Sequence, residues 1–367
     1  MLRLGRSGVI VMRAELKAGH KFRRKGQTVA TIYDVAEHAG VSKTTVSRVV
    51  NGETNVRPAT RAIVLKAVEE LQFLPNRAAR SLASQAEARI GLLYNNPSVA
   101  YFSEFLIGAL DGSGRNGAQL VVDKCEAGNP VIAADAVRKL IKGGLNGMVL
   151  TAPISESSEL IAELIEVGTA IVAVATGHFR GEVTCVGIDD FKAAYEMTQY
   201  LIGLGHARIG FVKGHPGHTS SRQRLLGFVA ALRDAGGMVE EPVIVQGFNS
   251  YRSGLEAGEQ LLSAPVLPTA IFASNDDMAS AAMSVAHRKG MDVPKDLSVV
   301  GFDDTIAGAV WPELTTVRQP ISEIAAISID EICRNIYGNR TGERSKPRNV
   351  LVPHKLIERE STAPLRR

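Results

Sequence analysis

The chain has 367 residues, of which 45% are hydrophobic, 22% are charged and 5% are aromatic, as expected for a folded protein of two or three domains. No apolar run approaches the roughly 20 residues of a membrane span, and Gly8–Met12 is too short for a signal-peptide core, so we expect a cytoplasmic protein without a membrane partner. Residues 1–84 hold 15 of the 42 basic and 6 of the 38 acidic residues, a balance of +9 against −5 for the remainder. This N-terminal excess of positive charge suits a polyanion such as nucleic acid.

Three cysteines, Cys125, Cys185 and Cys333, are widely spaced and form no C-x-x-C pair. Such spacing indicates neither a disulfide framework nor a zinc site, and we predict reduced, buried thiols. We assign no metal ligand and no cofactor from the sequence.

Residues 1–29 contain eight Lys/Arg against one acid, Glu15, and show no sustained hydrophobic periodicity. This composition predicts a disordered basic extension. It is either a non-specific DNA-binding arm or the product of a misassigned start codon.

The segment Thr31–Asn51, TIYDVAEHAGVSKTTVSRVVN, predicts two short helices joined by a Gly-Val turn. The first carries an apolar stripe at helical spacing and ends at Gly40; the stripe is Ile32, Val35, Ala36 and Ala39. Ser42 can cap the second helix, whose apolar positions are Val46, Val49 and Val50. Polar side chains on the outer face of the second helix make this pair a helix-turn-helix suited to DNA.

The pattern T-I-x-D-V-A-x-x-A-G-V-S-x-x-T-V-S-R-V-x-N in this segment resembles the DNA-binding signature of the LacI/GalR family of bacterial repressors. A third helix beginning at Pro58 completes a headpiece over residues 30–75, with an apolar side formed by Ile63, Val64, Ala67, Val68 and Leu71. Family members often have a hydroxyl cap before this proline. Here the residue is Arg57, which we expect to cost up to about 1 kcal/mol at the helix start.

The resemblance implies that this headpiece binds double-stranded operator DNA. Lys43 and Thr44, together with Ser42 at the start of the second helix, are expected at the DNA, with Lys43 and Thr44 specifying bases and Arg48 reaching a guanine edge. The residues expected to fix the register on phosphates are Thr31, Tyr33, Thr45, Ser47 and Asn51.

Residues 76–84, NRAARSLAS, resemble the family's hinge segment, and we place a hinge at 76–86. The resemblance implies a helix that forms on operator DNA and pairs in the minor groove with the hinge of a dimer mate. Leu82 corresponds to the family's leucine wedge, which kinks the duplex, and the other expected DNA contacts are Asn76, Arg77 and Ala78.

Residues 87–367 alternate between strand-like and helical segments, which predicts an α/β core of two-lobed, doubly wound parallel sheets. The expected strands are Ile90–Tyr94, Leu120–Val122, Met148–Leu150, Ala170–Val174, Ile209–Val212, Ala270–Ala273 and Leu297–Phe302. The segments LIGLGHARIGF, SNDDMA and SVVGFDD resemble the effector-binding core of the same repressors, which is similar to type I periplasmic sugar-binding proteins.

Two patterns in this core have simpler interpretations than a binding site. Gly112–Gly117 fits G-x-G-x-x-G, but a helix precedes it and a strand follows, which favours a helix exit over a nucleotide-binding turn. His215 and His218 lie in a Gly-Pro loop without a nearby carboxylate or thiol, which favours a solvated loop over a metal site.

Polar residues at the carboxyl ends of strands mark the expected ligand cleft between the lobes. By resemblance, Arg224, Asn275 and Asp303 hydrogen-bond the effector, with Ser220 and Gln319 as further candidates. Tyr101 and Phe105 align with pocket positions in the first lobe, where an aromatic ring can stack on a sugar. Asn275 and Asp303 can alternatively serve as a helix cap or an ion-pair partner.

The expected protein is a homodimeric repressor that a small sugar or sugar derivative releases from a pseudo-palindromic operator. Alternatives are a co-repressor-dependent regulator of the purine type, and a sugar-binding receptor or an enzyme on the same scaffold. The motifs G-x-S-x-G and G-x-x-x-x-G-K-[ST] are absent, so no catalytic residue is assigned. The C-terminal Ser361–Arg367 carries no leucine heptad, which favours a dimer over a tethered tetramer.

Overall fold

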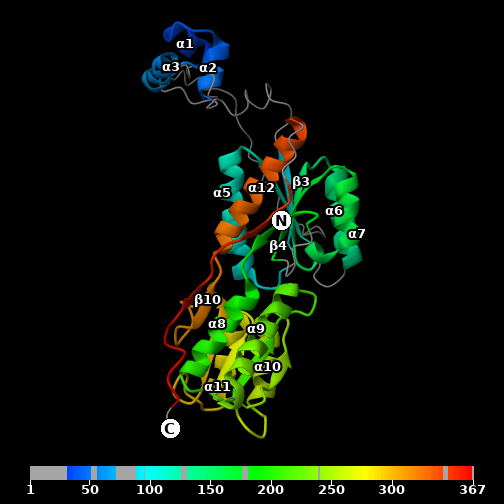
Figure 1. The fold of residues 1–367 in the computed structure, drawn as a ribbon, viewed down its shortest axis with the longest axis vertical. Helices are drawn as coiled ribbons and strands as arrows, with labels where there is room; N and C mark the ends of the chain where they lie inside the picture. The colour runs from blue at the N-terminus through cyan, green and yellow to red at the C-terminus, as the bar shows by residue number, and fades with distance from the viewer. Residues whose placement is uncertain are drawn as a thin grey trace, which may run out of the picture. The chain divides into compact units, whose positions relative to one another are not determined.

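The computed structural model describes residues 31–50, 56–71, 88–94, 96–124, 130–175, 181–238, 240–341 and 346–365. Contacts between residues divide the chain into two units, Met1–Gln85 and Ala86–Arg367 (Figure 1). Several expectations lie outside the described residues: the extension 1–29, Asn51, and the hinge residues Asn76, Arg77, Ala78 and Leu82.

The first unit contains three helices, α1 (Ile32–His38), α2 (Lys43–Val50) and α3 (Pro58–Glu70). They surround one small apolar core, whose buried members are Val35, Ala36, Val46, Val49, Val64 and Ala67. Gly40 has φ 63°, a left-handed conformation that glycine adopts without strain, at the turn between α1 and α2. The predicted helix-turn-helix is therefore present.

Side-chain caps determine where the first two helices begin. Thr31 and Asp34 form a reciprocal capping box at the start of α1. The Ser42 hydroxyl accepts a hydrogen bond of 3.2 Å from the backbone N–H of Thr45, as the sequence predicts. Arg57 makes no side-chain cap to α3, which also agrees with the prediction.

The apolar side of α3 is narrower than we expected. The sequence predicts Ile63 on that side, but Ile63 is 53% exposed, whereas Val64 and Ala67 are buried. Successive helical residues are about 100° apart, so Ile63 lies beside the buried stripe and not within it.

The second unit contains two six-stranded sheets. The first is built from β1 (Arg89–Tyr94), β2 (Gln119–Lys124), β3 (Gly147–Thr151), β4 (Ala170–Val174), β5 (Thr184–Gly187) and β11 (Asn349–Leu351). The second is built from β6 (Ile209–Lys213), β7 (Ile244–Gln246), β8 (Ala270–Ala273), β9 (Ser298–Asp303), β10 (Thr315–Arg318) and β12 (Lys355–Ile357). Their orders are β11-β5-β4-β3-β1-β2 and β12-β10-β9-β8-β6-β7, and all pairs are parallel except β10 with β12.

Helices cover both faces of each sheet, which confirms the predicted doubly wound architecture (Figure 1). The helices of the first lobe are α5 (Val99–Asn116), α6 (Pro130–Lys142), α7 (Ser158–Glu166) and α12 (Ile321–Thr341), with the 3-10 turn η1 (Ile154–Glu156). Those of the second lobe are α8 (Asp190–Gly203), α9 (Thr219–Ala235), α10 (Tyr251–Leu261) and α11 (Asp276–Arg288), with the 3-10 turn η2 (Gly236–Met238). No described helix is long and apolar enough to span a membrane.

The strands that the sequence did not mark are short and lie at or next to an edge of each sheet: β11 and β5 in the first sheet, and β12, β10 and β7 in the second. The Thr-rich β10 is an example: its buried Thr315 and Thr316 satisfy their hydroxyls with hydrogen bonds to distant residues, so their burial leaves no hydrophobic pattern. The chain crosses between the lobes three times, after β5, after β10 and after β11. These crossovers place residues of both lobes around one cavity.

The glycine pattern at Gly112–Gly117 is a helix exit, as predicted. Gly112 lies within α5, and Gly117 ends that helix with φ 62°. A Cβ at Gly112 would lie 2.9 Å from the Ile329 side chain, so this glycine allows α5 and α12 to pack closely.

Candidate functional site

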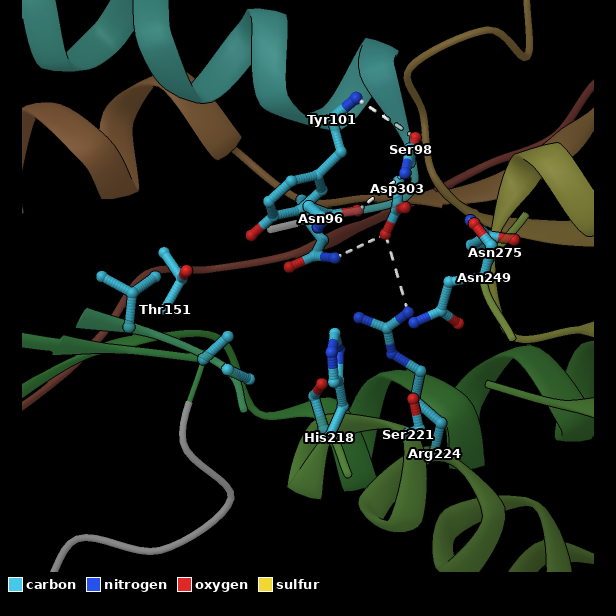
Figure 2. Close-up of a pocket in the computed structure, with 15 residues that line it drawn as sticks. Asn96, Ser98, Tyr101, Thr151, His218, Ser221, Arg224, Asn249, Asn275 and Asp303 are labelled. Carbon is cyan, nitrogen blue, oxygen red and sulfur yellow. Dashed lines mark hydrogen bonds and ion pairs between the residues drawn. The ribbon is translucent and has the colours of Figure 1, made fainter. Parts of the chain in front are cut away.

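A cavity lies between the two lobes of the second unit, and its lining is mostly polar (Figure 2). The cavity volume is about 50 Å³. The polar side chains come from Asn96, Ser98, Tyr101 and Thr151 in the first lobe, from His218, Ser220, Ser221, Arg224, Asn249, Asn275 and Asp303 in the second, and from Gln319 on a crossover.

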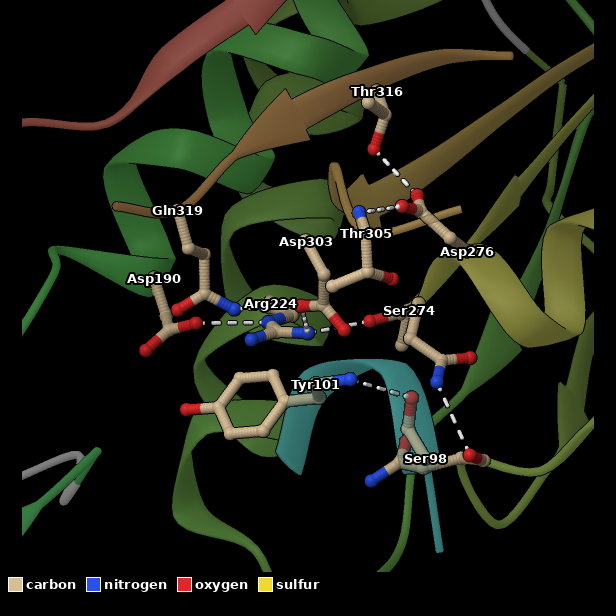
Figure 3. A network of polar contacts seen from close by, with 12 residues as sticks. Ser98, Tyr101, Asp190, Arg224, Ser274, Asp276, Asp303, Thr305, Thr316 and Gln319 are labelled. Carbon is tan, nitrogen blue, oxygen red and sulfur yellow. Dashed lines mark hydrogen bonds and ion pairs between the residues drawn. The ribbon is translucent and has the colours of Figure 1, made fainter. Parts of the chain in front are cut away.

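The guanidinium of Arg224, on α9, lies at the centre of a buried polar network (Figure 3). Its Nε donates to Asp190 Oδ1 at 2.8 Å, and its Nη1 donates to the Ser274 carbonyl at 2.5 Å. Nη1 also lies 3.6 Å from Asp303 Oδ1, and the guanidinium stacks 3.7 Å from the centroid of the Phe302 ring. Burial opposes the charge of Arg224, but Asp190 and Asp303 outweigh it and raise its pKa. The cation is therefore held in one position.

Asp303 ends β9 and directs its carboxylate into the cavity, where Gln319 Nε2 donates to Oδ1 at 2.6 Å. Its φ of 111° is unfavourable for a residue with a Cβ, and the next residue, Asp304, has φ 61°. Asp304 forms ion pairs of 2.5 Å with Arg318 and 2.8 Å with Arg359. These contacts offset the strain of the two-residue corner. Burial raises the pKa of the Asp303 carboxyl well above its ordinary value.

Asn275 lines the cavity, but its amide group already has partners. Its Oδ1 caps α11 by accepting from the Met278 N–H at 3.0 Å, and its Nδ2 donates to the Asn249 carbonyl at 3.1 Å. Nearby, the Ser98 hydroxyl of the first lobe donates to Asp277 Oδ2 of the second at 2.6 Å. The lobes are thus joined by a hydrogen bond at the edge of the cavity.

The expectation of a solvated histidine loop is wrong for His218. Its side chain lines the cavity and the residue is only 8% exposed, because α9 brings its first turn against the first lobe. Burial, with smaller contributions from His215 and Arg224, lowers the pKa of His218 to about 4. Its neutral imidazole offers a ligand one donor and one acceptor. No group of three or more metal-binding side chains occurs among the described residues.

The two aromatic candidates of α5 are in different environments. Tyr101 lines the cavity, and burial raises the pKa of its phenol. Phe105 is 2% exposed and belongs to the apolar core, so the expectation that it lines the pocket is corrected. The two rings stack with centroids 6.4 Å apart, since residues four positions apart lie on one side of a helix. The buried Phe105 ring therefore packs against the Tyr101 ring on the core side.

Of the other candidates, Asp303 lies at the cavity as the strand-end argument predicts, and Ser220, Arg224 and Gln319, which were named by resemblance, line it too. Sequence reasoning missed Asp190, because β5, which precedes it, was not recognised as a strand. Thr151 ends β3, a strand that was expected, so the same strand-end rule would have found it.

On the headpiece, every described residue expected at DNA lies at the surface. Thr31, Tyr33, Ser42, Lys43, Thr44 and Arg48 are exposed, while Thr45 and Ser47 are half-buried. These side chains form one face of α2 and the start of α1, which leaves the apolar side of both helices free to pack on α3.

A helix-turn-helix joined to a two-lobed core with an internal polar cavity defines a DNA-binding transcriptional regulator with a ligand-binding core. Residues 31–76 match the family model described as bacterial regulatory proteins, lacI family, and residues 198–362 match a periplasmic binding protein-like domain. The chain is 33% identical over 334 residues to catabolite control protein A of Priestia megaterium, covering 90% of this chain and 99% of that protein. The chain belongs to the lacI family of bacterial regulatory proteins.

Other relatives and solved structures agree with this assignment. The HTH-type transcriptional repressor PurR of Pasteurella multocida is 32% identical over 338 residues, covering 91% of this chain and 98% of the repressor. The lac repressor dimer bound to operator and the anti-inducer ONPF superposes with a TM-score of 0.68 at 28% identity, covering 91% of this chain and 99% of the repressor chain. A complex of the regulator CelR with cellobiose gives a TM-score of 0.64 at 29% identity, covering 90% and 99%.

Proposed function

We propose that the protein represses its target genes from a pseudo-palindromic operator and that a small sugar or sugar derivative, bound between the lobes, releases it. The observation that carries this proposal is the placement of Arg224 and Asp303 in one cavity that residues of both lobes line. A carboxylate accepts hydrogen bonds from vicinal hydroxyls, while a guanidinium donates to sugar oxygens. A ligand with several hydroxyls satisfies both groups at once.

The remaining lining of the cavity supports a polar ligand with several hydroxyls. Tyr101 offers an aromatic face, and the side chains of Ser220, Ser221 and His218 add donors and acceptors. CelR is solved with cellobiose, a disaccharide, and this relative supports the sugar class in general.

A thermal-shift comparison tests the ligand class with D-ribose, D-glucose, D-galactose, cellobiose, hypoxanthine and guanine. A true ligand at 100 times its Kd should stabilise the folded protein by about 2.7 kcal/mol. We expect a monosaccharide to raise the melting temperature of the parent and to have no effect on Arg224→Ala. Stabilisation by a purine alone would contradict the sugar assignment.

The second candidate is a co-repressor mechanism, which the similarity to PurR favours. The two mechanisms predict opposite effects on operator affinity, because a ligand shifts the population toward the conformation that it prefers. An inducer prefers the conformation that binds the operator weakly, and a co-repressor prefers the one that binds it tightly. We expect the stabilising compound to weaken operator binding in a gel-shift titration. A compound that tightens operator binding would establish the co-repressor mechanism instead.

The operator proposal rests on α2. One short helix reads too few base pairs to find a site in a genome, so two headpieces of a homodimer should bind two half-sites. Lys43 and Thr44 should specify bases, so a double mutant in which both residues are exchanged should select a different consensus operator from that of the parent. If the double mutant selects the same consensus as the parent, these two residues do not specify bases.

A homodimer also needs an interface between the two cores, and we propose that the surface around Trp311 forms it. This tryptophan is 84% exposed beside a groove of about 780 Å³ that includes Tyr251, Met283 and Met291. Exposed apolar surface of this kind marks protein interfaces. Trp311→Arg should shift the dimer–monomer equilibrium toward monomer in analytical ultracentrifugation. An unchanged equilibrium would place the interface elsewhere.

The hinge remains a sequence-based proposal. Leu82→Ala should reduce specific binding and DNA bending while leaving the salt dependence of non-specific binding unchanged, because the wedge acts through deformation and carries no charge. A circular-permutation bending assay measures this directly. Equal bending by variant and parent would exclude a wedge at this position.

A further inference from the structure

The first residue of α2, Lys43, makes a specific contact on the exposed face of the headpiece. Its Nζ lies 5.4 Å from the centroid of the Tyr33 ring and 3.4 Å from the Tyr33 hydroxyl oxygen. At this distance the Lys43 ammonium donates a hydrogen bond to the Tyr33 hydroxyl oxygen. The two residues come from α1 and α2, so the contact spans the turn of the helix-turn-helix.

Other sources of attraction for the ammonium are absent or already engaged. Within the described part of the headpiece, no carboxylate forms an ion pair with Lys43, and the first turn of α2 contains no acid. Asp34, the acid nearest in sequence to Tyr33, accepts hydrogen bonds from the N–H of Thr31 at 2.6 Å and from its hydroxyl at 2.8 Å. The partial positive charge at the start of α2 repels a cation. The Tyr33 side chain, through its hydroxyl oxygen and its ring, is therefore what holds this ammonium.

Tyr33 has no role in the fold that would explain its position. It is 63% exposed and does not belong to the apolar core of the headpiece. The capping box of Thr31 and Asp34 fixes the first turn of α1, which carries the ring. A tyrosine side chain has only two main torsions, whereas a lysine has four, so a fixed ring can order a mobile ammonium.

We infer that Tyr33 is a positioning residue for base recognition, and that it holds the Lys43 ammonium ready to donate to the edge of a guanine. The hydrogen bond to the Tyr33 hydroxyl and the exposed cation–π contact should restrict Lys43 before DNA arrives, which reduces the ordering cost of the specific complex. Tyr33 then contributes to discrimination between bases and not only to overall affinity. This inference rests on the proposed function, in which Lys43 specifies a base.

The test uses the full-length protein and duplex DNA. Binding-site selection from a random duplex library is carried out with the parent and with Lys43→Ala, and the base pair whose preference changes is taken as the Lys43 base pair. Dissociation constants are then measured on synthetic duplexes that carry each of the four base pairs at that position. The variants are Tyr33→Ala, Tyr33→Phe, Lys43→Ala and the double variant Tyr33→Ala/Lys43→Ala, with Leu65→Ala as a control for loss of an exposed apolar side chain on α3.

We expect Tyr33→Ala to reduce discrimination at the Lys43 base pair by about two- to fivefold, the range typical of an exposed cation–π contact. Discrimination at other positions and the melting temperature should be unchanged, as for Leu65→Ala. Tyr33→Phe keeps the ring but removes the hydroxyl that accepts from Lys43, so its discrimination should lie between that of the parent and that of Tyr33→Ala. The double variant should discriminate no worse than Lys43→Ala alone, because the ring acts through the lysine.

Three results would overturn the inference. Equal loss of affinity on all four duplexes would make Tyr33 a phosphate contact. Losses in discrimination that multiply in the double variant would show that Tyr33 acts independently of Lys43. If Lys43→Ala leaves the selected consensus unchanged, the base-reading role of Lys43 in the proposed function fails as well, which distinguishes that failure from the first two.

Discussion

The Asp190 carboxylate accepts a hydrogen bond of 2.8 Å from Arg224 Nε, and both side chains are less than a tenth exposed. Asp190 is the first residue of α8, just after the chain crosses from β5 into the second lobe. This ion pair therefore connects a crossover to the cavity. A buried pair of this kind depends on both members, because removal of one leaves the other charged and poorly solvated.

Asp190→Ala should lower the free energy of unfolding by about 3 kcal/mol, since Arg224 keeps only the more distant Asp303 as a charged partner. Chemical denaturation of parent and variant measures this loss. The control is Arg252→Ala, which removes an exposed pair with Glu256 and should leave the denaturation midpoint unchanged. Equal midpoints for Asp190→Ala and the parent would show that the pair is energetically neutral.

Asp303→Ala should abolish the response of operator binding to the effector and leave operator binding without effector intact. Asp303 lies in the second lobe, in a unit distinct from the headpiece, so its removal leaves the DNA-binding residues unchanged. The expected phenotype of this variant is permanent repression. A gel-shift titration with the stabilising sugar decides the matter: a parental dose response would make Asp303 a structural residue only.

Two glycines of α5 should respond in opposite ways to the same substitution. A Cβ at Gly108 would lie 1.9 Å from the Ser322 carbonyl oxygen of α12, whereas a Cβ at Gly114 meets nothing within 4 Å. Gly108→Ala should therefore lower the melting temperature by forcing the helices apart. Gly114→Ala should raise stability by about 0.5–1 kcal/mol, because alanine favours the helix. A stabilising Gly108→Ala would contradict the tight packing of α5 on α12.

Asp276 predicts a pH dependence of stability. Burial raises its pKa to about 7, although Thr316 and the Thr305 N–H donate to its two oxygens at 2.6 Å and 2.8 Å. Between the ordinary pKa of 3.8 and about 7, the folded state retains a proton that the unfolded state releases. Stability should therefore fall as pH rises through this range.

Asp276→Asn removes this titration while keeping one acceptor for the Thr305 N–H and one donor toward Thr316. Relative to the parent, the variant should gain about 1 kcal/mol for each pH unit between about pH 4 and 7. Melting temperatures at pH 5, 6 and 7 report the trend. Parallel curves for parent and variant would mean that the carboxyl ionises normally.

The headpiece was predictable from sequence because its determinants are local. Helical spacing of apolar residues, the Ser42 cap and Gly40 at the turn all act within a few residues, and each is seen in the structure. Arg224, which lies on α9, was assigned to the cavity by resemblance, whereas Asp303 was predictable there for a related physical reason. In a parallel sheet the carboxyl ends of strands meet at one edge, so position along a strand is enough to bring such residues together.

Only the tertiary structure decided which side chains reach the cavity. Tyr101 and Phe105 share one side of α5, and packing of that helix against the core buries one ring and leaves the other at the cavity. The sequence favoured a solvated loop for His218, but packing against the first lobe buries this side chain. Asp190 pairs with Arg224 because the crossover after β5 brings it to the cavity. Burial and ion pairing depend on segments far apart in the chain. Local sequence therefore determined most helices and strands and the polar residues at strand ends, whereas the packing of the two lobes determined which side chains line the cavity and how they pair.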